Sequence, residues 1–362
     1  MRQLIAIAAG LIPSTCSAGP DAFTIVALPD TQNYVDDSAN APLFTQQTQW
    51  IADQIQLDGN PRNIQFVTHL GDVVSDGDSL AQWFRADLSM NVLESGVDGV
   101  VPYGILPGNH DFASTGDKNT GTDDYLANFG PARFATRRWY GGADPSGNNS
   151  YQLFDGAGTN FLHLALEWRP TENVTNGPPR MPSPIEWAQS VISAHPGVPV
   201  IVSTHEYIDD DPAGRSSAGN ALWNELVRVN DQIIMVLNGH FHSVPGLNDG
   251  EYHQVSVNDY GNDVIEVLQD FQDYPNGGDG WLRLIEIDFA TDEVRFETYS
   301  PVLDTFQTET VREVGGFASQ FTIAMDFATR FDFAEPPAIP QPIFEQRVFR
   351  NGASGYAGTH DK

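Results

Sequence analysis

The sequence predicts an α/β fold in which helices cover two packed β-sheets. Apolar runs of strand length alternate with segments of helical spacing along most of the chain, and from residue 252 onward the pattern changes to strands. Helices and strands in this mixture favour a layered sandwich. The chain has 362 residues, of which 40% are hydrophobic and 11% aromatic, enough for one large domain or two modest ones with a buried core.

The first part of the chain predicts the order strand, helix, strand, helix, strand. The continuous apolar run over 23–28 is typical of a strand covered on both faces. Apolar spacing predicts helices over 45–57 and 79–93, and further strands over 64–70 and 103–106. This order implies parallel pairing through right-handed crossovers. Each strand ends in a polar loop, and ligand sites of such sheets lie at those carboxyl ends.

The rest of the chain predicts both kinds of element. The expected strands cover 151–154, 161–166, 200–204, 233–237, 252–257, 264–269, 281–289 and 294–299, and the expected helices cover 184–194 and 220–229. Residues 116–122 and 141–149 are expected to form turn-rich loops. Ala290-Thr291-Asp292 between the last two strands predicts a hairpin.

The charge balance excludes several function classes. Lysine and arginine number 18 against 48 aspartate and glutamate residues, which gives a formal net charge of −30. Nucleic acid and anionic lipid would both be repelled, so neither is expected as a partner. Charged residues are only 18% of the chain, which argues against disorder. The acidic residues indicate a solvated surface, with cation binding as the alternative.

Residues 1–18 predict a secretory signal peptide. Arg2 supplies a positive charge, residues 4–12 are apolar, and small residues lead up to Ala18. Cleavage after Ala18 would remove Cys16, the single cysteine, and a secreted or periplasmic location follows. A buried N-terminal strand and a lipidated Cys16 remain as alternatives. No other segment is long and apolar enough to cross a membrane, so no integral membrane segment is expected.

The C-terminal residues predict a linker followed by a short glycine-rich segment. Four prolines mark the linker, namely Pro336, Pro337, Pro340 and Pro342. The segment FRNGASGYAGTHDK after them resembles the opening of a β-sandwich module appended to secreted bacterial enzymes, although an ordinary tail is equally open. The expected division is 1–18 signal peptide, 19–334 main domain, and 335–362 linker with the start of a possible appended module.

Five short polar stretches each follow a predicted strand. They are Asp30-Thr31-Gln32, Gly71-Asp72, Gly108-Asn109-His110-Asp111, Thr204-His205-Glu206 and Gly239-His240-Phe241-His242. Singly each stretch is a weak signal. In this order and at these positions the chain resembles the calcineurin-like metallophosphoesterase family over residues 23–299. The resemblance implies a four-layer α-β-β-α sandwich with two mixed β-sheets, a metal site at the strand ends, and hydrolysis of a small phosphomonoester or phosphodiester.

The resemblance also implies two divalent metal ions, drawn from Mn, Zn, Fe, Mg and Ca. The first metal position would be held by Asp30, Gln32, Asp72 and His242, and the second metal position by Asp72, Asn109, His205 and His240. Two adjacent cations need a bridging anion and a mixed oxygen and nitrogen ligand set. Asp72 suits the bridge because its carboxylate offers one oxygen to each ion.

One residue departs from the family pattern. The first family motif usually reads Asp-x-His, whereas this chain has Gln32 at the third place. An amide oxygen is a harder and weaker ligand than imidazole, which leaves the identity and occupancy of the first metal open. In the alternative interpretation Gln32 makes only a hydrogen bond beside the metal.

The implied mechanism begins with a metal-bridging hydroxide that attacks phosphorus in line, while the metals polarise the phosphoryl oxygens. His110 would act as the general acid that protonates the leaving oxygen, and Asp111 would orient His110. The alternative for this pair is a turn that only shapes its loop. In a different function class, the chain would be a non-catalytic, metal-stabilised domain of a secreted surface or polysaccharide-binding protein.

Two arginines carry the positive charge that could bind phosphate, and one glutamate follows a proposed metal ligand directly in sequence. Arg169 and Arg215 are candidates for a phosphate contact, but surface salt pairing is the favoured expectation for both. Glu206 is expected to support the site, and a Glu206 side chain that faces into the site is the alternative. The sequence assigns no substrate-binding residue, and it leaves the physiological substrate open.

Overall fold

The computed structural model describes residues 19, 21–57, 59–95, 99–172, 182–242, 250–307 and 319–333. The expected signal peptide over 1–18, and the expected linker and appended module over 335–362, lie outside the described residues. The expectations for those segments therefore stay predictions.

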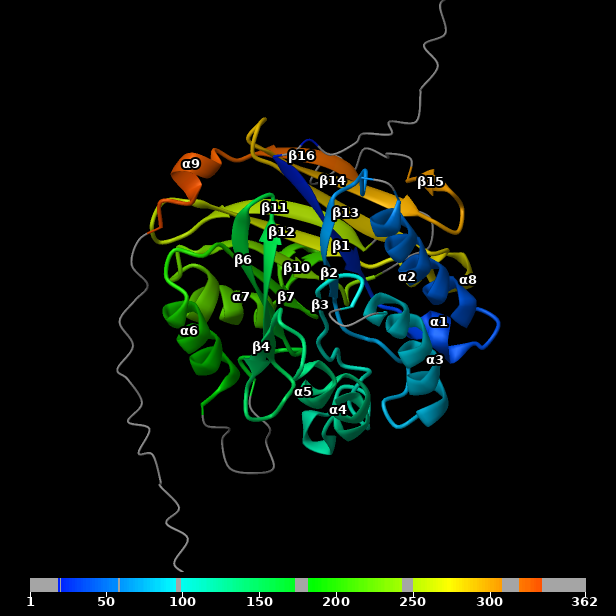
Figure 1. The fold of residues 1–362 in the computed structure, drawn as a ribbon. Coiled ribbons are helices and arrows are strands. Elements are labelled where there is room, and N and C mark those ends of the chain that lie inside the picture. Colours follow the sequence, from blue (N-terminus) through cyan, green and yellow to red (C-terminus); the bar gives the residue numbers. More distant parts are fainter. Residues whose placement is uncertain are drawn as a thin grey trace, which may run out of the picture.

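The described residues form two seven-stranded sheets (Figure 1). The first sheet contains β15 (Thr305–Phe306), β14 (Glu293–Ser300), β13 (Leu282–Asp288), β1 (Ala22–Leu28), β2 (Ile64–His69) and β3 (Tyr103–Gly104) in spatial order, with β16 (Gln320–Ala324) also paired to β14. The second contains β11 (Glu251–Val257), β12 (Asp263–Gln269), β10 (Ile233–Asn238), β7 (Val200–Thr204), β6 (Thr159–Leu166), β5 (Ser150–Gly156) and β4 (Tyr140–Ala143). A small hairpin joins β8 (Ile208–Asp210) to β9 (Ala213–Arg215).

Both sheets are mixed, and their parallel parts position the site. In the first sheet β1, β2 and β3 run parallel, whereas β13 pairs with β1 in the antiparallel sense. In the second sheet β6, β7, β10 and β12 run parallel, and β11, β5 and β4 are antiparallel to their neighbours. The hairpin expected between the last two predicted strands is present as β13 and β14.

Helices cover the outer faces of the two sheets. The helical segments are α1 (Gln32–Asp36), α2 (Ala41–Gln56), α3 (Leu80–Met90), η1 (Asn91–Glu94), η2 (Lys118–Thr120), α4 (Asp123–Phe129), α5 (Pro131–Phe134), α6 (Pro184–Ala194), α7 (Ser217–Leu222), η3 (Trp223–Val227), α8 (Pro275–Gly278) and α9 (Phe327–Arg330). Figure 1 shows α1, α2 and α3 on the side of the first sheet and α6 and α7 on the side of the second. The order of layers is helix, sheet, sheet, helix, as predicted.

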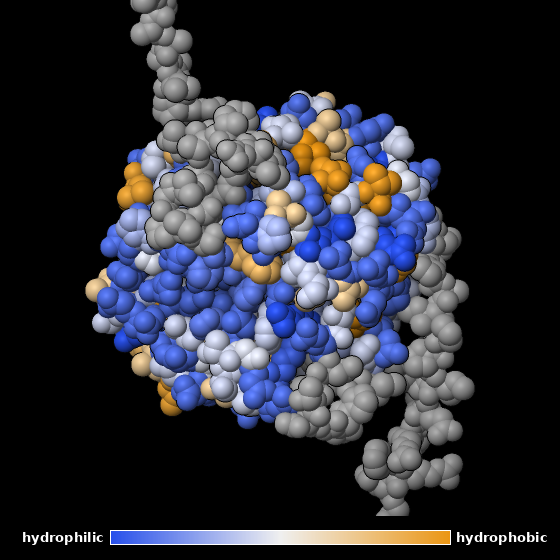
Figure 2. Space-filling model, turned by 180° about the vertical axis from the view of Figure 1, so that it is seen from behind, coloured by the Kyte–Doolittle hydropathy of each residue, from blue (hydrophilic) through white to orange (hydrophobic). Residues whose placement is uncertain are grey.

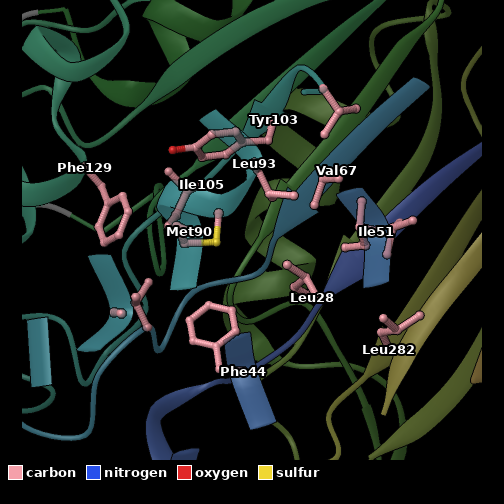
Figure 3. Packing of buried hydrophobic residues seen from close by; sticks show 14 of the residues in the cluster. Leu28, Phe44, Ile51, Val67, Met90, Leu93, Tyr103, Ile105, Phe129 and Leu282 are labelled. Carbon is pink, nitrogen blue, oxygen red and sulfur yellow. The ribbon is translucent and has the colours of Figure 1, made fainter. Parts of the chain in front are cut away.

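Three apolar clusters hold these layers together. Strand β1 divides its side chains between two of them, because alternate residues of a strand point to opposite faces. Phe23 and Ile25 pack between the sheets with Phe161 of β6, whereas Val26 and Leu28 pack beneath α2 and α3. Figure 3 shows part of this outer cluster. A third cluster lies between the second sheet and α6 and α7. The uninterrupted apolar run of β1 follows from burial on both faces.

Several short elements were not predicted. They include α1, α4, α5, α8, α9, β4, β8, β9, β15 and β16. The expected loop over 141–149 is partly wrong, since Tyr140–Ala143 forms β4 at the sheet edge despite its two glycines. Pairing with β5 and tertiary packing outweigh the low strand propensity of glycine there.

A buried histidine links the two sheets. His163 of β6 lies with Nδ1 2.7 Å from Oε1 of Gln152 and Nε2 2.8 Å from Oγ of Ser203. Its Nε2 also lies 3.2 Å from Oγ1 of Thr68, which belongs to β2 in the other sheet. Burial lowers the pKa of His163 from 6.5 to about 3, so the ring is neutral in the folded protein.

This histidine should make the fold sensitive to acid. Below pH 6.5 His163 is protonated in the unfolded chain, whereas in the folded protein it stays neutral down to about pH 3. The free energy of unfolding therefore falls as the pH drops from 6.5 to about 3. Between pH 7 and pH 5 the loss from this group is about 2 kcal/mol. Urea unfolding of wild type and His163→Gln at both pH values measures it. Carboxylates act equally in both proteins, so an identical pH dependence would refute the prediction.

One face of the molecule is largely hydrophilic, in line with the composition (Figure 2). Figure 2 shows one face on which hydrophilic side chains predominate and apolar ones lie in small groups. None of the helices that the structure describes has the length and apolar character needed to cross a membrane.

Candidate metal centre

The five polar stretches follow five parallel strands of the two sheets. Strands β1, β2 and β3 of the first sheet and β7 and β10 of the second each lead into one of them. Because the sheets pack face to face, these carboxyl ends lie at one end of the sandwich. The predicted placement of the stretches at strand ends is confirmed.

Three ligand-type atoms gather around Nε2 of His205. The distance from this nitrogen is 2.9 Å to Oδ1 of Asn109, 3.1 Å to Nδ1 of His240 and 3.2 Å to Oδ2 of Asp72. Among the described residues, the ligand atoms of Asp72, His205 and His240 all lie within 4.8 Å of one another. The structure thus brings together all four residues proposed for the second metal position.

The hydrogen bonding of His205 shows that these atoms suit a cation. Nδ1 of His205 lies 3.0 Å from the carbonyl oxygen of Leu70, which can only accept, so Nδ1 carries a proton. In the neutral ring Nε2 then presents a lone pair toward the carboxylate of Asp72 and the amide oxygen of Asn109. Lone pairs that face one another at these distances repel unless a proton or a metal cation lies among them. Metal-bound histidines commonly donate their other N–H to a backbone carbonyl in this way.

Glu206 supports the cluster from beside it, as predicted. Its Oε2 lies 3.7 Å from Nε2 of His240 and accepts hydrogen bonds from Nε1 of Trp168 at 2.9 Å and Nε of Arg169 at 2.6 Å. Glu206 therefore turns the Nδ1 side of His240 toward His205. The guanidinium of Arg169 also lies over the ring of Trp168.

The salt pairing expected for the two candidate arginines is confirmed, but the carboxylates of Glu206 and Glu266 are buried and do not lie at the surface. Arg169 pairs with Glu206 and, at 3.5 Å, with Glu172. Arg215 pairs with the buried carboxylate of Glu266 through two nitrogens. Both guanidinium groups therefore already have carboxylate partners.

The residues proposed for the first metal position are only partly assembled. Asp30 and Gln32 are buried, and Oδ2 of Asp30 and Oε1 of Gln32 have no hydrogen-bond partner. The amide nitrogen of Gln32 donates to Oδ2 of Asp72 at 3.0 Å, which is the hydrogen bond foreseen in the alternative interpretation. A buried acceptor without a partner is costly, so the two free oxygens fit a cation that takes up their lone pairs.

His242 lies apart from the cluster. Its side chain is 40% exposed, and Nδ1 lies 2.8 Å from Oδ2 of Asp273. The described structure thus gives His242 a carboxylate partner instead of a place beside Asp72, and its role as a ligand stays a prediction.

The backbone at the strand ends has an unusual conformation. Asp30, Asp72 and His240 have φ of 31°, 47° and 73°, in the left-handed region that few non-glycine residues adopt. Two glycines make room for them. A Cβ on Gly108 would overlap Oδ1 of Asp72, and one on Gly239 would overlap Oδ2 of Asp30. The glycines of the motifs thus allow backbone to approach the carboxylates closely.

The charges of the cluster shift the pKa values of its members. Burial, and then the negative charges of Asp270 and Asp72, hold the pKa of Asp30 well above its ordinary value. Burial also opposes ionisation of Asp72, but contacts with His205 and His110 outweigh it and lower the pKa of Asp72 to about 2. The same pairing raises the pKa of His205 in spite of burial. Asp72 is thus the carboxylate held most firmly in its charged form.

The expected contact between His110 and Asp111 is wrong. Nδ1 of His110 lies 2.7 Å from the carbonyl oxygen of Ser75, so this carbonyl orients the ring. The carboxylate of Asp111 instead accepts three backbone N–H bonds, from Gly108 at 2.8 Å, Val74 at 3.0 Å and Val73 at 3.1 Å. Burial and the charge of Asp72 raise the pKa of Asp111 to about 7. Asp111 therefore joins the two loops that carry Asp72 and His110, rather than holding the imidazole.

One residue near the cluster was missed in the sequence. Asp270 follows β12 directly, and its side chain is buried. The signal that could have found it is the same one that marked the five stretches, a polar residue at the end of a parallel strand. The strand over 264–269 was predicted, but nothing in the sequence placed it parallel to β10.

Two comparisons with known proteins bear on this centre. The family model described as calcineurin-like phosphoesterase matches residues 23–244, which include every residue proposed for the two metal positions. A protein of Bacillus subtilis (strain 168), described as uncharacterized protein YvnB, is 33% identical over 344 residues. That match covers 92% of this chain and 24% of the relative, so the chain spans about a quarter of the relative's length.

Proposed function

Because the chain belongs to the calcineurin-like phosphoesterase family, we propose that it hydrolyses a small phosphomonoester or phosphodiester with two divalent metal ions. The observation that carries this proposal is the convergence of Asp72, Asn109 and His240 on Nε2 of His205. These side chains come from four different strand ends, and their lone pairs fit a cation.

In this proposal the two metal positions differ in chemistry. The second metal position has imidazole nitrogens from His205 and His240 together with oxygens from Asp72 and Asn109, a set that suits Zn, Fe or Mn. The first metal position has the oxygens of Asp30, Gln32 and Asp72, with His242 as the remaining proposed ligand. When bound, such ions polarise phosphoryl oxygens and lower the pKa of a water molecule toward neutrality.

The chain itself supplies the proton for the leaving group. Since Nδ1 of His110 donates to the carbonyl of Ser75, the other nitrogen, Nε2, is the one available to protonate the leaving oxygen. The backbone N–H of His110 donates to Oδ1 of Asp72 at 2.9 Å, which fixes the acid relative to the proposed bridging carboxylate. Asp111 holds both loops in place through its three backbone contacts.

Removing the metal tests this proposal. The metal-free chain should release no phenol from an aryl phosphate or an aryl phosphodiester, and added Mn²⁺ should restore release, because the positive charge at the site comes from metal and not from lysine or arginine. Raising the salt concentration should change the rate on these small substrates by less than about threefold, since the contacts at bound metal are short compared with the screening length.

Two outcomes would contradict it. A wild-type chain that binds no divalent ion, or one that binds two ions and hydrolyses no member of a phosphoester panel, would refute the phosphoesterase. The second outcome would favour the non-catalytic, metal-stabilised domain. We also propose secretion through the signal peptide over 1–18, which N-terminal sequencing of the exported protein would test through cleavage after Ala18.

A further inference from the structure

Asp270 occupies a strand end that the five polar stretches do not include. Strand β12 runs parallel to β10, with Leu268 opposite Asn238. Continuing this register places Asp270 beside His240 at the carboxyl edge of the second sheet. The amide of Gln269 donates to the carbonyl oxygen of Asn238 at 3.1 Å and ties the two strand ends together.

The side chain of Asp270 lacks a full set of partners. It is 1% exposed, and Oδ1 accepts the backbone N–H of Gln272 at 3.0 Å. Its Oδ2 is buried without a hydrogen-bond partner. Buried carboxylates in proteins are normally paired, hydrogen-bonded or bound to a metal. Asp270 has the burial of such a group, but half of its carboxylate has no protein partner.

Two hydrogen bonds connect the surroundings of Asp270 with the segments that carry Asp30 and Gln32. The backbone N–H of His240 donates to Oδ1 of Asp30 at 3.2 Å, which brings Asp30 to the edge where Asp270 emerges. Next to Gln32, the side chain of Asn33 donates to the carbonyl of Gln272 at 3.0 Å and joins α1 to the Asp270 loop.

We propose that Asp270 is a ligand of the first metal position, where it joins the free oxygens of Asp30 and Gln32. This inference rests on the proposed two-metal function. Asp270 lies outside residues 23–244, so the family match does not assign it. Its carboxylate supplies the negative charge that the neutral amide of Gln32 lacks. The resulting oxygen-rich set prefers hard ions such as Mn²⁺ or Mg²⁺, in contrast to the nitrogen-containing second metal position.

Calorimetric titration of the full, metal-free chain with Mn²⁺ tests the assignment. Wild type should bind two ions, and Asp270→Asn should bind one of them at least about 100-fold more weakly while the other changes less than about threefold. Asp263→Asn is the matched control, because Asp263 lies at the opposite end of the same strand, is exposed and loses the same charge. It should keep both affinities.

Thermal stability gives a second test that needs no measurement of activity, and a second variant, Asp270→His, adds to it. Without metal, Asp270→Asn should melt at the same or a higher temperature than wild type, since a buried carboxylate oxygen without a partner is removed. The rise in melting temperature on adding Mn²⁺ should be smaller in Asp270→Asn than in wild type. Asp270→His, which restores a ligand but changes its type, should regain the lost ion with a preference shifted toward Zn²⁺.

The outcomes separate this proposal from the proposed function. If wild type and Asp270→Asn both bind two Mn²⁺ ions with equal affinities and equal thermal stabilisation, Asp270 is not a ligand, and the phosphoesterase proposal stands. If wild type binds no Mn²⁺, both proposals fail. A weakened ion in Asp270→Asn that Asp270→His recovers as Zn²⁺ supports the assignment.

Discussion

Replacing Asp72 by asparagine is expected to weaken the binding of both metal ions and to lower kcat/KM by about 10³-fold. Asp72 is the one residue proposed for both metal positions, and its pKa of about 2 keeps it charged. The substitution removes that charge and leaves its hydrogen-bond donor Gln32 and the neighbouring His205 with an amide in place of a carboxylate. A loss of about 4 kcal/mol of charge stabilisation in the transition state corresponds to this factor.

Metal content measured after dialysis against Mn²⁺, together with kcat/KM on an aryl phosphate, checks the expectation. Gln32→Ala is the informative companion, since Gln32 belongs to the first metal position only and should weaken a single ion. If Asp72→Asn lost one ion and retained the other at wild-type affinity, Asp72 would not bridge the two positions.

Replacing His110 by alanine is expected to lower kcat by about 10²- to 10⁴-fold while both metal ions stay bound. General acids contribute a factor of this size. The loss should be largest for alkyl phosphates, whose leaving oxygen needs the proton most, and smallest for p-nitrophenyl phosphate. Metal binding should persist because His110 contacts Asp72 through its backbone N–H, which alanine retains.

His195→Ala is the matched control for this variant. His195 also places Nδ1 against a backbone carbonyl, that of Val191 at 2.8 Å, but it follows α6 and is not among the residues of the cluster. Its removal should leave kcat unchanged for both classes of substrate. A loss in His110→Ala that is the same for good and poor leaving groups would exclude the role of general acid.

Long elements with a clear apolar pattern could be predicted from the sequence. The helix over 184–194 appears with the predicted bounds, because Pro184 at its first position and a capping box between Ser183 and Glu186 mark its start. Strand β1 was recognisable because both its faces are buried. In contrast, α1 has only five residues and β4 contains two adjacent glycines, so neither shows the apolar periodicity from which a helix or a strand is predicted.

The proposed ligands could be placed at strand ends, but their contacts could not. The partner of His110 is the carbonyl of Ser75, 35 positions earlier, and a backbone carbonyl leaves no trace in a sequence motif. Adjacency suggested Asp111 for that role, yet the turn directs its carboxylate toward three N–H groups of other loop residues. Asp270 was missed for a related reason, since its place depends on which strand lies beside β12.

The left-handed backbone at Asp30, Asp72 and His240 has a consequence for how this protein can change over generations. Strained positions of this kind lower stability and persist only where function retains them. Glycine at any of the three would relax the chain and remove a proposed metal ligand in the same step. Selection for heat resistance alone would therefore erode the centre, whereas selection for new substrates is expected to act through the surrounding loops and leave these three positions untouched.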